Sequence, residues 1–122
     1  MNISAVLNKT VRRDLKVSAG NEFTLSLAVY PIDDQEQTAS DMSGSVITLY
    51  VYYSTANYVT DYGYTLESNS PIFTIEGVEG TATTFDFLSS HTSDLKGRYL
   101  LKIKRTSASK TATLVDGTLT VN

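Results

Sequence analysis

The sequence contains no cysteine and no tryptophan, only 2 prolines and a single histidine in 122 residues. Without cysteine, disulfide scaffolds, thiolate zinc sites and cysteine nucleophiles are excluded. One imidazole and no thiol leave few groups for catalysis. We therefore predict that the chain is not an enzyme and that it needs no cofactor and no metal.

Positive charge is also scarce, because 10 Lys and Arg stand against 13 Asp and Glu, for a net charge of −3. The basic residues are spread along the chain rather than gathered in the patch that nucleic-acid binding requires. The longest apolar runs, such as residues 47–53, fall far short of the ~20 residues that cross a bilayer. The first residues show no secretory signal pattern. We expect no nucleic-acid partner, no membrane partner, and synthesis in a cytoplasm.

Thr, Val, Tyr, Phe and Ile, by contrast, recur in short runs separated by Gly, Asp, Asn and Ser, which is typical of strands joined by turns. Residues 23–30 alternate apolar and polar side chains with a period of two, so one face of this strand is predicted to be buried. The same alternation predicts a strand over 97–104 that buries Tyr99, and a weaker edge strand over 11–17. Two short strands, over 112–115 and 118–121, are expected on either side of a bulge or turn at Asp116-Gly117.

Residues 45–53 form a further predicted strand, with Ile47, Leu49, Val51 and Tyr53 turned inward and Thr48, Tyr50 and Tyr52 turned outward. Residues 72–76 and 83–87 are predicted to form a hairpin, because the two glycines of the intervening 77–80 segment permit a tight turn.

These elements predict an all-β fold: a single antiparallel β-sandwich of seven to eight strands, with one helical turn over 89–95. The sandwich is assigned to residues 11–122. Residues 1–10 carry scattered apolar side chains without a firm period. They are predicted to be an N-terminal arm or edge segment, with an extra strand of the same domain as the alternative.

Four segments, in this order, carry a resemblance to a known family. They are Gly20-Asn21-Glu22-Phe23, Met42-Ser43-Gly44-Ser45-Val46-Ile47-Thr48-Leu49, Thr92-Ser93-Asp94-Leu95-Lys96-Gly97-Arg98-Tyr99 and Gly117-Thr118-Leu119-Thr120-Val121. Together they resemble the immunoglobulin-like domains of tailed-phage virion proteins, typified by the N-terminal domain of baseplate upper proteins. The departures are Asn for Asp at position 21, Met for Leu at position 42, and one residue fewer in the third segment.

The resemblance implies an immunoglobulin-like sandwich and a structural role in a bacteriophage virion, as a tail, baseplate or neck adaptor or as a head decoration protein. It implies location in the virion and contacts with other virion proteins in multiple copies, with self-association in the particle left open. It implies no catalytic residues.

Two polar clusters were weighed as chemical sites. His91 lies in a loop with serines and Asp94, but one loop cannot hold a Ser, a His and an Asp in triad geometry, so a polar turn is favoured. Asp33, Asp34, Glu36 and Asp41 offer oxygen ligands but lack the alternating spacing and the glycine bend of a calcium loop. A solvated acidic loop is the favoured interpretation.

The candidate interface residues come from the N-terminal segment and from a concentration of tyrosines in residues 50–64: Ile3, Val6, Leu7, Tyr50, Tyr52, Tyr58, Tyr62 and Tyr64. Outward tyrosines among Ser, Asn and Gly are typical of adaptable binding surfaces. Cross-strand tyrosine pairs that merely stabilise a sheet are the structural alternative. The functional alternative is a glycan or host-surface binding module that uses this tyrosine-rich loop.

Overall fold

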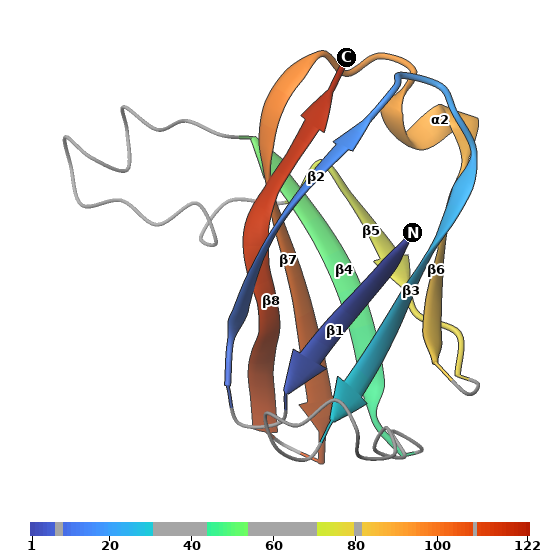
Figure 1. The fold of residues 1–122 in the computed structure, drawn as a ribbon. Helices are drawn as coiled ribbons and strands as arrows, with labels where there is room; N and C mark the ends of the chain where they lie inside the picture. Colours follow the sequence, from blue (N-terminus) through green and yellow to red (C-terminus); the bar gives the residue numbers. More distant parts are fainter. Residues whose placement is uncertain (7–8, 31–43, 54–70, 80–81, 109) are drawn as a thin grey trace, which may run out of the picture.

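A computed structural model describes residues 1–6, 9–30, 44–53, 71–79, 82–108 and 110–122. Its eight strands and one short helix are β1 (Asn2–Val6), β2 (Val11–Val17), β3 (Phe23–Tyr30), β4 (Val46–Tyr53), β5 (Phe73–Glu76), β6 (Thr83–Phe87), α2 (Ser89–Thr92), β7 (Gly97–Ser107) and β8 (Lys110–Val121) (Figure 1). The strands form a three-stranded sheet, β1-β3-β6, and a five-stranded sheet, β2-β8-β7-β4-β5. The predicted all-β sandwich is confirmed.

The two sheets are mixed rather than purely antiparallel. β1 pairs in parallel with β3, and β2 pairs in parallel with β8, whereas the other pairs are antiparallel. Parallel neighbours cannot be joined by a tight hairpin, so each of these two strands lies beside a strand that is remote along the chain. The local alternation of side chains identifies a strand but says nothing of such a partner.

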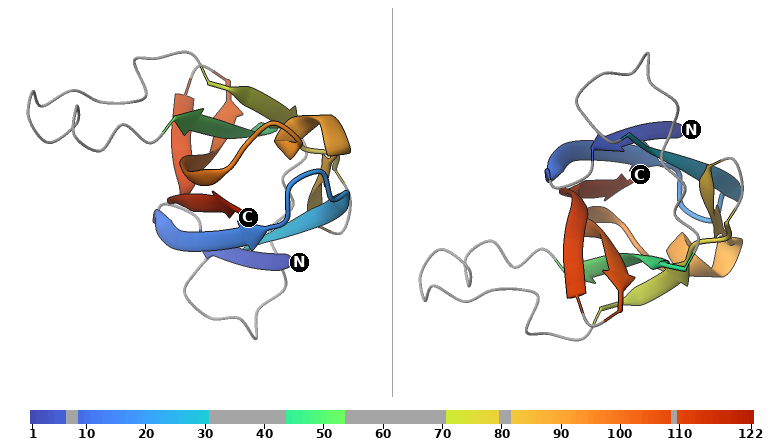
Figure 2. Two further views of the ribbon diagram at one scale, coloured as in Figure 1. Left: turned by 90° about the horizontal axis from the view of Figure 1, so that it is seen from above. Right: turned by 90° about the horizontal axis from the view of Figure 1, so that it is seen from below.

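The hydrophobic core lies between the sheets, which Figure 2 shows end-on with β1 and β3 on one side and β4 and β5 on the other. The predicted inward faces of β3 and β7 are confirmed, since Leu25 and Leu101 are fully buried and Tyr99 is 9% exposed. The other large side chains with almost no exposure are Phe85, Phe87, Leu27, Leu49, Ile103, Leu119, Val29, Val51, Val115 and Val121.

The N-terminal segment is an edge strand of the domain and not a free arm. β1 aligns Ile3 with Leu27 and Ala5 with Val29. Ile3 is 4% exposed and Ala5 is fully buried, so both belong to the core. The extra-strand alternative is therefore the one found, because burying these two side chains removes apolar surface from water.

The strands predicted over 72–76 and 83–87 do not pair with each other as a hairpin, and among the described residues one antiparallel bridge between Val78 and Thr84 is all that joins the two sides of the connection. β5 pairs with β4 in one sheet and β6 pairs with β3 in the other, so the chain crosses between the sheets at this point. The crossing is tight at Gly77, where a Cβ atom would lie 2.4 Å from the Thr83 methyl group and 3.0 Å from the Ile47 carbonyl oxygen. Glycine is needed here because Thr83 and the Ile47 backbone lie too close for a side chain, and not because it forms a two-residue turn.

The last strand is continuous through Asp116 and Gly117, so the predicted break there is also wrong. The irregularity of β8 lies earlier: Ile103 faces Val115 but Lys104 faces Thr113, which leaves Leu114 as the extra residue of a β-bulge. Gly117 instead lies at a close approach of β8 to β2. A Cβ atom at Gly117 would lie 1.7 Å from the Arg13 carbonyl oxygen.

The turn from α2 into β7 is fixed by Tyr99. Its hydroxyl group donates to the Lys96 carbonyl oxygen at 2.9 Å and accepts from the Lys96 N–H at 3.0 Å. A tyrosine that bonds back to the backbone a few residues upstream also occurs at a strand start in immunoglobulin-like sandwiches. The predicted helical turn is confirmed in α2, whose buried Thr92 accepts a hydrogen bond from the Gly20 N–H at 3.0 Å.

Candidate interaction surface

The structure describes four of the eight predicted interface residues, and it places Ile3 and Val6 in one sheet and Tyr50 and Tyr52 in the other. Ile3 is buried in the core and is not available to a partner, whereas Val6 is half-buried at the end of β1. Leu7, Tyr58, Tyr62 and Tyr64 lie outside the residues that the structure describes, as do Asp33, Asp34, Glu36 and Asp41. Tyr50 and Tyr52 are both on β4 and point to the outer side of the five-stranded sheet.

The inward and outward assignment of β4 holds except at the end of the strand. Tyr52 was expected to be exposed, but it is 4% exposed, and Tyr53, which was expected to be buried, is 60% exposed. Tyr52 stacks on Tyr50, with ring centroids 6.2 Å apart and planes at 14°, and it lies opposite Leu100 of β7. Tyr52 thus points outward but is covered by neighbouring side chains on the same face of the sheet. Tyr53, at the end of β4, tilts against Tyr99 instead.

The outer side of the five-stranded sheet forms a continuous polar and aromatic surface, which we call the basic face. Strand register places its side chains in cross-strand rows, such as Arg12, Asp116, Lys102 and Tyr50. The charged members of the face are Arg12, Asp14, Lys16, Glu76, Arg98, Lys102, Lys104 and Asp116. Five of these side chains are cationic and three are carboxylates, so the face carries a formal charge of +2.

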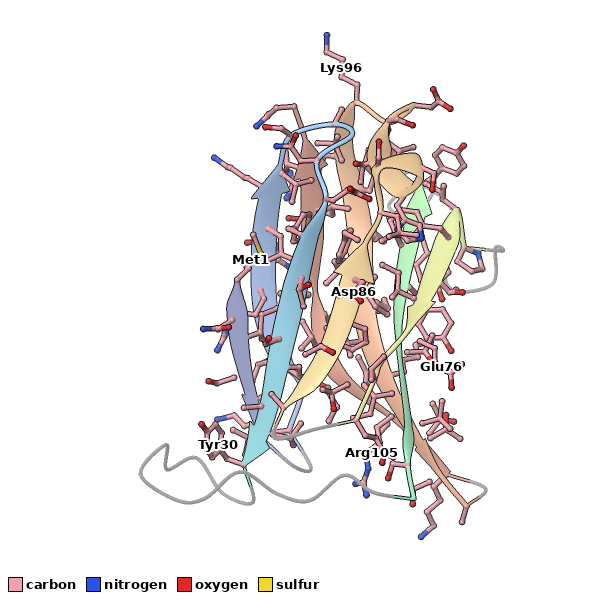
Figure 3. All side chains as sticks on the ribbon, turned by 90° about the vertical axis from the view of Figure 1, so that its right-hand side faces the viewer. Met1, Tyr30, Glu76, Asp86, Lys96 and Arg105 are labelled. Carbon is pink, nitrogen blue, oxygen red and sulfur yellow. The ribbon has the colours of Figure 1, made fainter. Side chains whose placement is uncertain are left out.

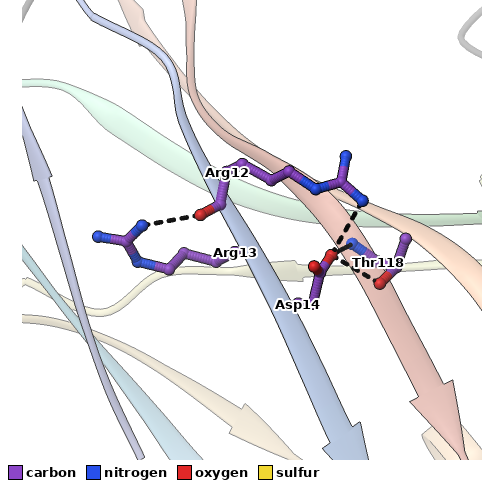
Figure 4. A network of polar contacts seen from close by, with 4 residues as sticks. All are labelled: Arg12, Arg13, Asp14 and Thr118. Atoms are coloured by element: carbon purple, nitrogen blue, oxygen red, sulfur yellow. Dashed lines mark hydrogen bonds and ion pairs between the residues drawn. The ribbon is translucent and has the colours of Figure 1, made fainter.

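Asp14 lies on the edge strand β2 of the basic face and is held by three polar contacts (Figure 4). Its carboxylate accepts hydrogen bonds from the Thr118 hydroxyl at 2.8 Å and the Thr118 N–H at 3.2 Å, and it pairs with Arg12 at 3.2 Å. The hydroxyl bond is the main reason that the pKa of Asp14 is lowered, with Arg12 adding to it. Asp14 therefore ties β2 to β8 and is part of the scaffold rather than a reactive acid.

The aromatic part of the basic face is covered by lysine. The Lys104 ammonium nitrogen lies 5.4 Å from the centre of the Tyr50 ring, which is a cation–π distance. Lys102 lies 3.9 Å from Asp116. These contacts hold long side chains along the sheet, where their methylene stems cover apolar surface and their charges reach water.

The outer side of the three-stranded sheet is different, and we call it the acidic face. Figure 3 shows this side of the molecule, with Asp86 labelled on β6. The outward side chains on β1, β3 and β6 include the small residues Ser4, Ser26 and Ala28, which line a hollow of about 460 Å³. The charged side chains of this face are Glu22 and Asp86, which line a second hollow of about 290 Å³. Asp86 accepts a hydrogen bond from the Thr24 hydroxyl at 2.7 Å. No cationic side chain is among the outward residues of this face that the structure describes, so these outward side chains sum to −2. Arg13 of β2 reaches the edge of the face, where its guanidinium group donates to the Ser4 carbonyl oxygen at 3.3 Å.

His91 is a packing residue in α2. Its ring stacks on Phe73 with centroids 4.8 Å apart and meets Phe87 edge-on at 6.2 Å. Its Nδ1 atom accepts the Leu88 N–H at 2.9 Å, which fixes the neutral ring with its proton on Nε2. Burial lowers the pKa of His91. Within the described part of the chain no group of three or more His, Cys, Asp or Glu is placed to hold a metal ion.

The sequence had no signal for the pairing of charged rows on the basic face, because these rows depend on which strands are neighbours. The Lys104 contact with Tyr50 joins β7 to β4, and the Asp14 contact with Thr118 joins β2 to β8. The sequence shows cationic residues alternating over 98–104, but it does not show that aromatic side chains of β4 lie beside them.

The chain matches no protein-family model and no curated protein. Among the residues that the structure describes, no helix is long and apolar enough to cross a bilayer.

Proposed function

We propose that this chain is a non-enzymatic structural component of a bacteriophage virion, a tail, baseplate or neck adaptor or a head decoration protein. It acts through protein–protein contacts and is located in the virion in multiple copies. The observation that carries the proposal is the basic face, a surface of five paired strands on which charged and aromatic side chains are held by cross-strand contacts. Prearranged side chains lose little entropy when a partner binds.

The four segments of the phage-domain pattern give a second line of support. Gly20, from the first segment, donates its N–H to the Thr92 hydroxyl of the third segment, at 3.0 Å. Gly20 also has a positive φ of 77°, which favours glycine at this turn. Tyr99, which ends the third segment, bonds back to Lys96 at the start of β7. The first and third segments thus meet at one end of the sandwich, which supports the resemblance at these two segments.

A glycan or host-surface binding module is the alternative, with the tyrosine-rich segment 50–64 as its site. Sugars stack on open aromatic ring faces. In the described part of that segment Tyr52 is 4% exposed, and Tyr50 contacts both the Tyr52 ring and the Lys104 ammonium group. Tyr53 is 60% exposed, with its ring tilted against Tyr99. Two of these three rings offer little free face to a sugar, which favours protein contacts.

The proposal is tested by producing phage particles with a tagged chain and purifying them on a density gradient. Quantitative mass spectrometry should find the wild-type chain in every particle in multiple copies. The basic-face variant, Lys16→Gln with Arg98→Gln, should melt within a few degrees of wild type and be incorporated at least several-fold less.

The matched control is Glu79→Gln with Lys96→Gln, which removes two exposed charges outside both faces and should be incorporated as wild type. Absence of the chain from purified particles would overturn the proposal. Saturable binding of the isolated chain to one class of glycan on an array, together with that absence, would establish the alternative.

A further inference from the structure

The two outer faces of the sandwich carry opposite charge, and this asymmetry points to a partner. The outward side chains of the basic face sum to a formal charge of +2 and those of the acidic face to −2. Lys16 and Arg98 on the basic face and Glu22 and Asp86 on the acidic face are all exposed. We propose that the basic face of one copy of this chain binds the acidic face of a second copy.

Shape agrees with this pairing. The acidic face has small side chains at its centre, where Ser4, Ser26 and Ala28 line the hollow of about 460 Å³. The basic face has long side chains, with Lys102 and Lys104 extended over the sheet beside Tyr50. Small residues on one sheet allow the long residues of another sheet to approach, as in the face-to-face packing of sheets about 10 Å apart.

The contact is head-to-tail, because the two faces lie on opposite sides of the sandwich. Each copy that binds through one face presents the other face to the next copy. A head-to-tail contact closes into a ring or continues as an open stack, according to the rotation between copies. This inference rests on the proposed function, since it names the partner of the basic face.

The size of the acidic face predicts that each contact is weak. Three strands spaced about 4.8 Å apart, with β3 rising about 3.3 Å per residue, offer about 350–400 Å² per copy. Such an interface lies well below the roughly 1,200 Å² of a stable complex. Association should therefore need high protein concentration and low salt, and many copies held at fixed spacing would strengthen it by avidity.

The experiment uses sedimentation velocity on the full chain over a range of concentrations, at about 20 mM and about 500 mM salt, where screening differs strongly. The wild-type sedimentation coefficient should rise with concentration at low salt and return to the monomer value at high salt. The basic-face variant and an acidic-face variant, Glu22→Gln with Asp86→Asn, should each stay monomeric, since each pair of changes brings its face to a formal charge of zero.

An equimolar mixture of the two variants is the decisive sample. Each variant keeps one native face, so the mixture should form dimers and nothing larger, whereas wild type continues beyond the dimer. The control variant, Glu79→Gln with Lys96→Gln, should associate as wild type. The inference is overturned if wild type stays monomeric at low salt, if the control loses association, or if the mixture stays monomeric or grows beyond dimers.

Failure of this inference and failure of the proposed function are separable. If wild type is monomeric but the basic-face variant is still lost from particles, the basic face binds a different virion protein. If wild type associates in solution but the chain is absent from particles, the self-contact stands and the virion role falls.

Discussion

Gly117→Ala is expected to destabilise the sandwich strongly, through a collision between two backbones. β2 passes so close to β8 at this point that an added Cβ would lie 1.7 Å from the Arg13 carbonyl oxygen and 2.6 Å from the carbonyl carbon. Cβ contacts below 3.0 Å are essentially never found, so the Arg13 carbonyl must retreat by at least 1.3 Å, the difference between 3.0 and 1.7 Å. No side-chain rotation relieves a contact with backbone.

The size of the loss in the free energy of unfolding follows from the hydrogen bonds that break when the Arg13 carbonyl group moves away. A hydrogen bond of ordinary length that is stretched by more than 1 Å is lost, and each lost bond costs about 1 kcal/mol. The bonds from Thr118 to the Asp14 carboxylate, at 2.8 and 3.2 Å, lie next to the collision. With one ladder bond added, and with Leu15 partly unpacked, the free energy of unfolding should fall by about 3–4 kcal/mol. That is a large share of the ~5–15 kcal/mol available to a domain.

The measurement is urea unfolding followed by circular dichroism, with Gly44→Ala as the control. Gly44 has a φ of +77° and nothing within 4 Å of its added Cβ, so this control pays only the ~1–2 kcal/mol of a strained backbone. Gly117→Ala should lose clearly more than Gly44→Ala. If it unfolds within about 1 kcal/mol of wild type, which is near the error of such extrapolations, the close approach of β2 to β8 is refuted.

Further outcomes follow from other parts of the molecule. Ile3→Ala should lower the free energy of unfolding by about 2–4 kcal/mol, because β1 is part of the core; chemical denaturation checks this, and a loss near zero would return β1 to the status of a free arm. Tyr99→Phe should lower the melting temperature by several degrees, because two hydrogen bonds to Lys96 are removed; an unchanged melting curve would count against these bonds. Burial lowers the pKa of His91 below its ordinary value of 6.5, so the unfolded chain takes up the proton first as the pH falls, and this contribution to stability should be lost progressively below pH 6.5. His91→Phe should remove that part of the decline in a pH series of melts. Dialysis against EDTA should leave the melting temperature unchanged, and a drop that calcium reverses would place a cation at the acidic residues 33–41.

Much of the fold was predictable because burial imposes a period of two on each strand. Phe23 to Val29 and Tyr99 to Ile103 alternate cleanly, and their inward faces are those of the structure. The order and approximate ends of the strands followed from the same alternation. The partner of each strand did not, since the sequence of residues 72–87 suits a hairpin and a crossing between sheets equally well.

Exposure at the candidate site was less predictable for a related reason. Tyr52 follows the pattern of an outward residue, yet neighbours on the same face cover it. Tyrosine is compatible with both environments because its ring is apolar and its hydroxyl is polar. The burial of Ile3 is not evident from the sequence, because a five-residue strand that pairs in parallel with a strand far along the chain leaves almost no local pattern.

The parallel pairing of β2 with β8 also bears on how the chain reaches its native state. Asp14 and Thr118, which bond across this pair, are separated by 104 positions in sequence. During synthesis, β2 leaves the ribosome early and has no partner in its sheet until residues 110–121 have followed. Ordering so long a loop is slow and costs entropy before any bond is gained. We therefore expect nascent chains that stop before β8 to keep β2 unprotected from amide exchange and open to chaperones, with stable structure arising only when the last strand docks.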